Sequence, residues 1–283
     1  MNDERLIISA DIGGTNSRFA LVNEDYEIVK SVSRRTILYK KDEFVASIIT
    51  AIKDLGGNFE NIIGLSLGIP GPIKDGGYVV DLPNIHIQDI PLGDILRREF
   101  GLPVFIRNDA EMACFAEASL GSGKNYHRVF FITISTGLGG ALVTDKNFDE
   151  TPFEIGHTPY TYKGEKKFYE YFASGTGLAN LARMYDLEIN NSLHFFELVV
   201  AKDRKALLVY KEWLAILGDF LAYIKSDYHP DIIAITGGVF NSKDVFWNDL
   251  IKLHPDLNLQ ECYFFQNAGI IGSASYGFSM LNN

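Results

Sequence analysis

A strand–glycine turn–strand pattern occurs twice in this chain, and it constrains the fold more than any other feature. Residues 7–22 run from an apolar strand through the turn at Gly13-Gly14 into a second apolar strand. Residues 128–144 repeat this order through the turn Thr136-Gly137-Leu138-Gly139-Gly140, about 120 residues later. Two equivalent beginnings at this spacing predict two related halves.

The hydrophobic periodicity predicts an α/β architecture of two lobes with a cleft between them. Strands are expected at residues 6–10, 17–22, 27–36, 62–67, 104–106, 128–135, 141–144 and 231–236. Helices are expected at residues 41–55, closed by Gly56-Gly57, and at 94–100, 110–120, 175–185, 192–201, 203–228 and 269–281. We expect an N-terminal lobe of residues 1–112, joined by the C-terminal helix 269–283, and a C-terminal lobe of residues 113–268.

Composition excludes several classes of partner. The 283 residues, 47% of them hydrophobic, carry a net charge of −10 without a Lys/Arg stripe, which argues against nucleic acid and anionic membrane. Cys114 and Cys262 alone cannot build a disulfide framework or a four-cysteine zinc site. The chain does not open with a basic region followed by an apolar signal segment, and no apolar run approaches the ~20 residues of a membrane helix. A cytoplasmic protein is expected.

The motif Asp11-x-Gly13-Gly14-Thr15 is chemically suited to phosphate. Glycine tolerates positive φ and lets backbone N–H groups approach an anion closely, and Thr15 adds a hydroxyl donor. Asp11 could hold Mg²⁺ directly or through water, since Mg²⁺ usually keeps several waters. A hairpin turn with a capping aspartate is the alternative interpretation.

Two further glycine turns extend this hypothesis. Thr136-Gly137 opens the matching turn of the second half, so the two turns could clamp one polyphosphate. Gly237-Gly238 follows a buried strand, where a nucleotide base or ribose could lie against bare backbone. Any one of these glycine turns could be a plain strand–loop junction. It is much less expected that all three have no part in ligand binding.

Polar residues near these turns suggest a second substrate. Asn108-Asp109 ends a strand and opens a helix, so it reads either as a helix cap or as a proton acceptor with an orienting amide. Glu154 and His157 are close enough in sequence to reach one polyhydroxy ligand, although a lone histidine is more often structural. Glu170 and Asn84 read alone as a helix-flanking charge and a turn residue.

In combination, these motifs resemble the ROK family (repressor, open reading frame, kinase), whose fold is actin/Hsp70/hexokinase-like, that is, ribonuclease H-like. The resemblance runs nearly end to end. Residues 8–22 and 136–140 are similar to its phosphate loops, residues 68–72 and 82–84 to its sugar-side loops, and residues 108–110 to its catalytic motif. Residues 154–157 and 170–175 are similar to its sugar-clamp segments, and Gly237-Gly238 to its adenosine loop.

The resemblance implies ATP-dependent phosphorylation of a hexose or an N-acetylhexosamine. Asp109 would be the base. The sugar would be held by Gly71, Asn84, Asn108, Asp109, Glu154, His157 and Glu170. ATP would be held by Asp11, Gly13, Gly14, Thr15, Asn16, Arg18, Thr136, Gly137, Gly237 and Gly238, with Mg²⁺ bound to Asp11 through water.

Three functions are compatible with this resemblance. Overall similarity favours phosphorylation of the 6-hydroxyl of N-acetylmannosamine, in the breakdown of sialic acid. The same chemistry on glucose is the alternative, because pocket shape decides the 2-substituent. A sugar-sensing repressor is the alternative from another class, but we expect no DNA-binding segment before the first strand at Leu6.

One stretch departs from the family pattern. The family usually carries a Cys-x-Cys-x4-Cys zinc loop between the positions matched by His157 and Glu170, whereas residues 158–169 contain no cysteine. Zinc needs about four good ligands, so we predict no structural zinc. Packing of the aromatic side chains in this stretch would hold it instead, through Tyr160, Tyr162, Phe168 and Tyr169. The family commonly forms dimers, and a homodimer is expected.

Overall fold

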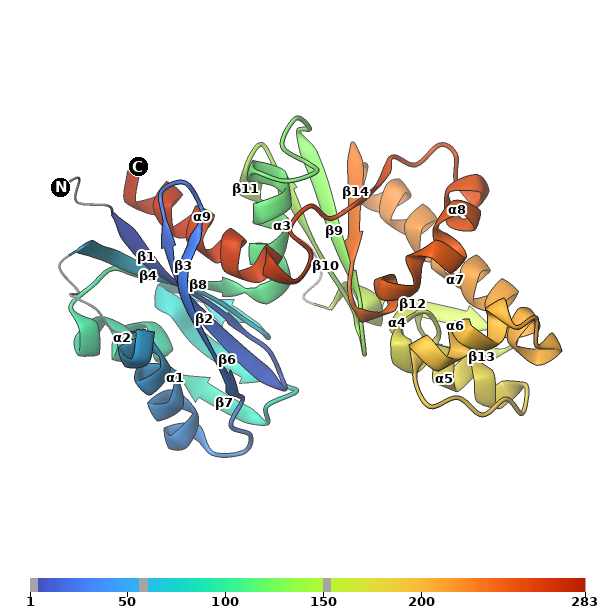
Figure 1. The fold of residues 1–283 in the computed structure, drawn as a ribbon, viewed down its shortest axis with the longest axis horizontal. Coiled ribbons are helices and arrows are strands. Elements are labelled where there is room, and N and C mark those ends of the chain that lie inside the picture. Colours follow the sequence, from blue (N-terminus) through green and yellow to red (C-terminus); the bar gives the residue numbers. More distant parts are fainter. Residues whose placement is uncertain (1–4, 56–60, 150–153, 283) are drawn as a thin grey trace. The chain divides into compact units, whose positions relative to one another are not determined.

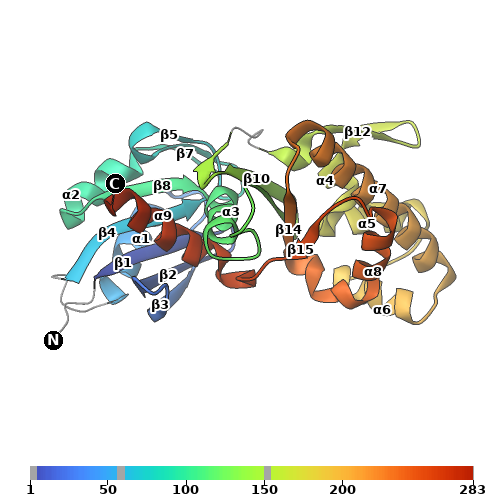
Figure 2. The same cartoon turned by 90° about the horizontal axis from the view of Figure 1, so that it is seen from above.

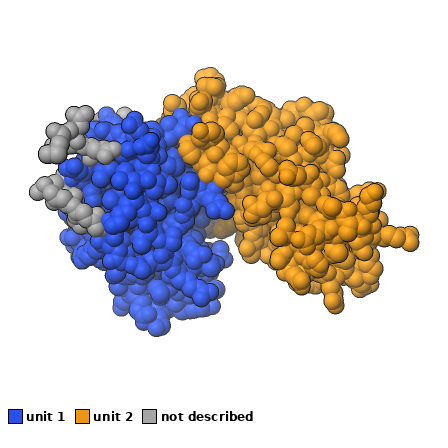
Figure 3. Space-filling model, in the orientation of Figure 1, with its two compact units in different colours: residues 1–120, 266–283 blue, residues 121–265 orange. Residues whose placement is uncertain are grey.

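The computed structural model describes residues 5–55, 61–149 and 154–282, and the chain divides into two compact units. Unit 1 comprises residues 1–120 and 266–283, and unit 2 comprises residues 121–265 (Figure 3). The expected boundary at residue 112 differs from this division, and it falls within one continuous helix, α3 (Asp109–Ser119). The predicted helix end at Gly56-Gly57 lies outside the described residues.

Unit 1 is built on a five-stranded sheet with helices on both faces (Figure 1). The strand order is β3 (Ile28–Arg35), β2 (Asn16–Asn23), β1 (Leu6–Ile12), β4 (Ile62–Ile69), β8 (Val104–Asn108). Strands β3, β2 and β1 form an antiparallel meander, and β1, β4 and β8 run parallel. A small sheet of β5 (Ile73–Lys74), β6 (Tyr78–Leu82) and β7 (Ile87–Ile90) completes the unit.

Alternation along β1 explains the two layers of helices. Ile8 belongs to the core formed with α1 (Lys41–Leu55) and α2 (Leu92–Phe100), whereas Ile7 belongs to the core formed with α9 (Ala268–Asn282). Successive side chains of a strand point to opposite faces, so one strand supplies both cores. Helices α3 and α9 lie side by side (Figure 2), and they approach so closely that a Cβ on Gly272 would stand 1.7 Å from the Met112 carbonyl oxygen.

Unit 2 repeats the same sheet. The strand order is β11 (Asn147–Phe148), β10 (Leu138–Thr144), β9 (Arg128–Ile134), β14 (Ile232–Thr236), β15 (Leu259–Glu261). The first three strands are antiparallel and the last three are parallel, as in unit 1. The prediction of two related halves is therefore confirmed at the level of sheet topology.

The helices of unit 2 pack around an aromatic-rich core. They are α4 (Tyr169–Ala173), α5 (Gly175–Met184), α6 (Ser192–Val200), α7 (Arg204–Tyr228) and α8 (Lys243–Leu253). A separate hairpin of β12 (Pro159–Tyr162) and β13 (Glu165–Phe168) precedes α4. The long helix α7 contributes Trp213, Leu217 and Phe220 to the core, all of them buried. Within the described part of the chain, no helix combines the length and apolarity that crossing a bilayer requires.

Candidate functional site

The carboxyl ends of three neighbouring strands meet at one edge of the unit 1 sheet. Asp11 of β1 pairs with Gly68 of β4, and Gly68 pairs with Arg107 of β8. Neighbouring strands lie about 4.8 Å apart, so Asp11 and the chain that leads into Asp109 share this edge. In open α/β sheets, ligands bind outside the carboxyl ends of the parallel strands. The sheet therefore brings the first phosphate motif and the predicted base to the same edge of unit 1.

The turn between β1 and β2 is braced by the end of β3. The Thr36 hydroxyl donates a 2.7 Å hydrogen bond to the Gly13 carbonyl oxygen, and the Thr36 N–H donates to the Thr15 carbonyl oxygen at 3.0 Å. A Cβ on Gly14 would lie 3.1 Å from the Cβ of Asn84. Asn84 occupies the turn between β6 and β7, as predicted, and this turn lies directly against the phosphate motif.

The Asp11 carboxylate faces the first turn of α9. A Cβ on Gly269 would stand 2.5 Å from the Asp11 Cγ, so the carboxylate lies very close to the α9 backbone. Burial raises the pKa of Asp11, and the Arg18 guanidinium opposes that rise. Arg18 also donates to the Gln266 carbonyl oxygen and, at 2.7 Å, to Asn267 Oδ1. The first phosphate motif is thereby tied to the segment that leads into α9.

Asn108 caps helix α3 and also contacts a loop that was predicted to face the sugar. Its Oδ1 accepts hydrogen bonds from the N–H groups of Ala110 (2.9 Å) and Glu111 (3.4 Å), and its Nδ2 donates to the Gly71 carbonyl oxygen at 3.3 Å. Asp109 Oδ1 also accepts from the Ala110 N–H, at 2.9 Å. The helix-cap interpretation of Asn108 is correct, and the cap fixes the backbone from which the Asp109 carboxylate projects.

Gly71 is required by the backbone of this loop. Its φ is +97°, and a Cβ would stand 1.9 Å from the Asp81 carbonyl oxygen. We expect Gly71→Ala to lower the free energy of unfolding by about 2–4 kcal/mol, from left-handed strain plus overpacking. Gly101→Ala is the matched control, since φ is +67° there but nothing lies within 4 Å, so it should cost about 1–2 kcal/mol. Equal losses in chemical denaturation would contradict this view of Gly71.

In unit 2, Glu170 joins a glycine turn to a predicted sugar residue. Its Oε2 accepts a 2.8 Å hydrogen bond from the Leu138 N–H, and its Oε1 lies 3.3 Å from His157 Nε2. A Cβ on Gly137 would stand 2.5 Å from Glu170 Oε2, so glycine is needed for this approach. The second phosphate motif and the predicted sugar clamp therefore share one carboxylate.

Glu154 lies in the same cluster. Its carbonyl oxygen accepts the His157 N–H at 2.8 Å. Burial raises the pKa of the Glu154 carboxyl, His157 opposes this rise, and the Glu170 carboxylate adds to it. Glu154 thus joins His157 and Glu170 through its backbone and its charge, and the three side chains together can accept and donate hydrogen bonds to several hydroxyls.

Ser135 was missed by the sequence analysis, although it joins three segments of unit 2. Its Oγ accepts the Gly238 N–H at 3.0 Å, and its carbonyl oxygen accepts the N–H of Gly175, at the start of α5, at 2.7 Å. Its own N–H donates to the Gly137 carbonyl oxygen at 2.9 Å. The second and third glycine turns are therefore neighbours, and the start of α5 lies beside them. A serine at a strand end carries no pattern that would have revealed this role.

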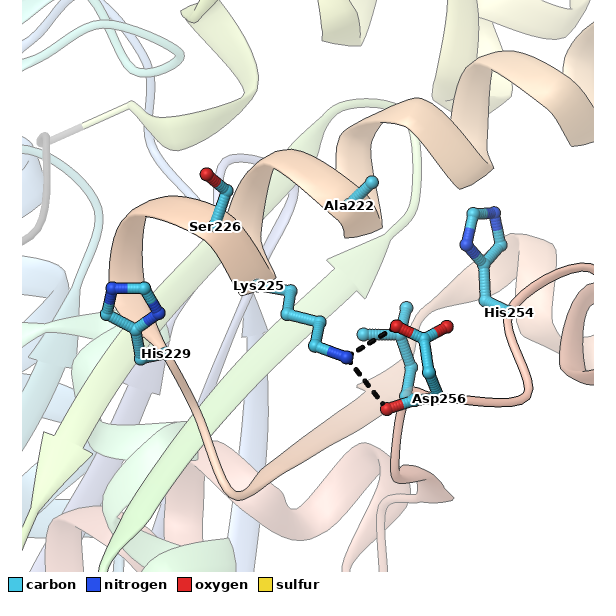
Figure 4. Close-up of a pocket in the computed structure, with 7 residues that line it drawn as sticks. Ala222, Lys225, Ser226, His229, His254 and Asp256 are labelled. Carbon is cyan, nitrogen blue, oxygen red and sulfur yellow. Dashed lines mark hydrogen bonds and ion pairs between the residues drawn. The ribbon is translucent and has the colours of Figure 1, made fainter.

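A groove elsewhere in unit 2 is separate from this cluster. It is lined by Ala222, Lys225, Ser226, His229, His254, Asp256 and Leu257 (Figure 4). Lys225 Nζ donates to Asp256 Oδ2 at 2.5 Å and to the Asp256 carbonyl oxygen at 3.0 Å. The charge of Lys225 is therefore already neutralised by Asp256. None of the predicted site residues lines this groove, and no site is assigned to it.

The stretch 158–169 folds as the β12–β13 hairpin, and aromatic rings pack along it. Tyr160 stacks on Tyr169 with 4.4 Å between ring centroids, and Tyr162 meets Phe172 at 5.3 Å. Within residues 5–55, 61–149 and 154–282, no three His, Cys, Asp or Glu side chains gather as a metal site. We expect elemental analysis of the purified protein to find no tightly held zinc. One zinc per chain would contradict that expectation.

Comparison with known proteins assigns the family. The ROK family pattern matches residues 7–273, so the chain belongs to the ROK family. Its fold is the mixed α/β, actin-like fold of ROK proteins and hexokinases, with two sheets of the same topology. A glucokinase of Halalkalibacterium halodurans is 30% identical over 285 residues, which cover 89% of this chain and 85% of that protein. Xylose repressors also match, including one from Bacillus subtilis.

Two solved structures are also informative. A suspected N-acetylmannosamine kinase from Listeria monocytogenes superimposes with a TM-score of 0.85 at 23% identity, covering 98% of this chain and 100% of that one. A ROK family glucokinase from Streptomyces griseus, in complex with glucose and AMPPNP, superimposes with a TM-score of 0.77 at 24% identity, covering 96% and 98%. At these identities the likeness establishes the fold alone.

Proposed function

We propose that this protein is an ATP-dependent sugar kinase, which transfers the γ-phosphoryl group of ATP to the 6-hydroxyl of a hexose or an N-acetylhexosamine. One observation carries the proposal: in each unit, residues predicted to bind phosphate touch residues predicted to bind sugar. Gly14 lies against Asn84 in unit 1, and the turn at Gly137 lies against Glu170 in unit 2. A nucleotide phosphate and a sugar hydroxyl held by these residues would be neighbours, as phosphoryl transfer requires.

Asp109 is the proposed base. Its carboxylate would accept the proton of the 6-hydroxyl as the bond to phosphorus forms, while Asn108 orients the sugar. Further sugar contacts are assigned to Gly71, Asn84, Glu154, His157 and Glu170. The capped start of α3 supports this assignment, because a base must be held at a fixed position relative to its substrate.

The glycine turns are the proposed nucleotide site. Phosphate contacts are assigned to Asp11, Gly13, Gly14, Thr15, Asn16, Arg18, Thr136 and Gly137, and the adenosine to Gly237 and Gly238. The bound nucleotide in the Streptomyces griseus glucokinase supports ATP as the donor. Mg²⁺ would be held by Asp11 through water and by the phosphates, and would neutralise charge on them.

Two sugars remain candidates for the acceptor. The Listeria monocytogenes structure supports N-acetylmannosamine. The glucokinases of Thermotoga maritima and Halalkalibacterium halodurans favour glucose. A coupled assay of ATP consumption over N-acetylmannosamine, N-acetylglucosamine, glucose, mannose and fructose distinguishes them. We expect turnover with N-acetylmannosamine or glucose, and activity with none of the five sugars would contradict the proposal.

A sugar-sensing repressor is the alternative from another class, and the xylose repressors among the relatives favour it. A repressor would bind a sugar without consuming ATP, so the same assay separates the two functions. We also expect a homodimer. Size-exclusion chromatography with light scattering, which measures the molar mass in solution, would test this.

A further inference from the structure

The hairpin β12–β13 connects two residues of the proposed sugar clamp. His157 lies just before it and Glu170 just after it, and the Tyr169 N–H donates to the Thr158 carbonyl oxygen at 3.1 Å to close its base. His157 also packs on Phe168, the last residue of β13, with 4.6 Å between ring centroids. Any tilt of the hairpin would therefore move both clamp residues.

Two tyrosine hydroxyls fasten this hairpin to helix α7. Tyr160 donates to Asp219 Oδ2 at 2.6 Å, and Tyr162 donates to Glu212 Oε2. Tyr160 and Tyr162 are two residues apart on a strand, so they share one face. Glu212 and Asp219 are seven residues apart on a helix, so they also share one face. One face of β12 thus meets one face of α7 at two matched positions.

A third contact fixes the tip of the hairpin. Lys163 and Gly164 have φ of +50° and +82°, as a tight two-residue hairpin turn requires. Lys163 Nζ donates to the Tyr185 hydroxyl at 2.5 Å and to Glu212 Oε1 at 3.4 Å. Burial and the Asp219 carboxylate raise the pKa of Tyr160, so that hydroxyl remains a donor at physiological pH.

Helix α7 also holds the other end of the clamp. The Trp213 indole N–H donates to the carbonyl oxygen of Ala173, the last residue of α4, at 2.9 Å, and both residues are buried. Glu170 lies in α4. Helix α7, which binds the hairpin through Glu212 and Asp219, therefore also binds α4. The hairpin and α4 are thus both held in position by α7.

We infer that Tyr160, Tyr162, Glu212 and Asp219 are positioning residues for the sugar. Their bonds to α7 set where His157 and Glu170 meet the sugar hydroxyls, and so affect the affinity for the sugar acceptor more than the affinity for ATP. This inference deepens the proposed function and rests on it. None of the four is assigned a contact with the sugar; each acts through the orientation of the hairpin.

The double substitution Tyr160→Phe/Tyr162→Phe tests the inference, since it removes both hydroxyls and keeps both rings. We expect the KM for the sugar to rise about tenfold, as for the loss of two hydrogen bonds of about 0.5–1.5 kcal/mol each. The KM for ATP should change less than about twofold. Hydrogen exchange of the amides in residues 157–170 should also become faster in the double variant.

Tyr210→Phe is the matched control. Tyr210 also lies on α7, and its hydroxyl donates to Asp249 Oδ2 of α8 at 2.8 Å, away from the hairpin. Tyr210→Phe should lower the free energy of unfolding by about as much per hydroxyl removed as the double substitution does. It should leave the KM for the sugar and the hydrogen exchange of residues 157–170 unchanged. An equal rise in the KM for the sugar in the control would overturn the inference, because it would show a general loss of stability.

Hydrogen exchange separates failure of this inference from failure of the proposed function. If the wild-type protein turns over no sugar, the proposed function is wrong, and unchanged exchange in the double variant would then independently overturn the positioning role. If the wild-type protein is active but the double variant keeps its KM for the sugar, the proposed function stands and the inference falls.

Discussion

Replacing Asp109 by asparagine is expected to lower kcat at least ~10²-fold while leaving the fold intact, since removal of a general base typically costs 10²–10⁴-fold. Asparagine has the same shape, and its Oδ1 can still accept the Ala110 N–H that Asp109 Oδ1 accepts at 2.9 Å. It cannot take up the proton of the sugar hydroxyl. Steady-state kinetics with the preferred sugar, combined with thermal denaturation, measure both effects.

Glu111→Gln is the control for that experiment. Glu111 lies in the same first turn of α3, and its Oε2 accepts the Asn108 N–H at 3.4 Å as part of the cap. Burial raises the pKa of Glu111, and Arg107 opposes this rise. Glu111 is therefore a second carboxyl group with a raised pKa in the same turn, but we do not assign it the role of base. We expect kcat within a few-fold of wild type. Near-normal turnover in Asp109→Asn would remove Asp109 from the role of base.

Replacing Glu170 by alanine should lower kcat/KM for the sugar about 10- to 100-fold. The change leaves the Leu138 N–H without its charged acceptor and releases His157. A hydrogen bond to a charged group is worth about 1.5–3 kcal/mol, which corresponds to this range. Because Glu170 Oε2 also lies against Gly137, the KM for ATP should rise as well. Initial rates with each substrate varied in turn measure both changes.

Glu165→Ala provides the comparison for Glu170. Glu165 lies in β13 of the same hairpin, where it forms an exposed ion pair with Lys167 at 3.9 Å. Exposed pairs of this kind contribute about 0–1 kcal/mol, so the variant should keep wild-type kinetics. If Glu165→Ala and Glu170→Ala were equally impaired, Glu170 would have no special part in the site.

Long, periodic elements could be predicted from the sequence. Helix α1 has the predicted bounds, because Phe44, Ile48 and Ile52 recur at helical spacing and are all buried. The sheets of β5–β7 and β12–β13 were missed, because their strands are too short for alternation to be read. Helix α8 was also missed, and of its eleven residues Phe246 and Leu250 are buried.

The domain boundary could not be read locally, because no linker marks it. Helix α3 belongs to unit 1 through its packing against α9, which comes from the other end of the chain. The same limit applies to the candidate site. Motifs suggested which residues matter, but the contact between Glu170 and the turn at Gly137 and the joining role of Ser135 depend on segments that only the tertiary fold brings together.

Phosphorus-31 NMR of the purified protein with ATP, Mg²⁺ and the preferred sugar tests the central claim most directly. We expect the γ-phosphate resonance of ATP to disappear as a sugar 6-phosphate and ADP appear in equal amounts. ADP accompanied only by inorganic phosphate, or no change in the ATP signals with any sugar of the panel, would contradict it.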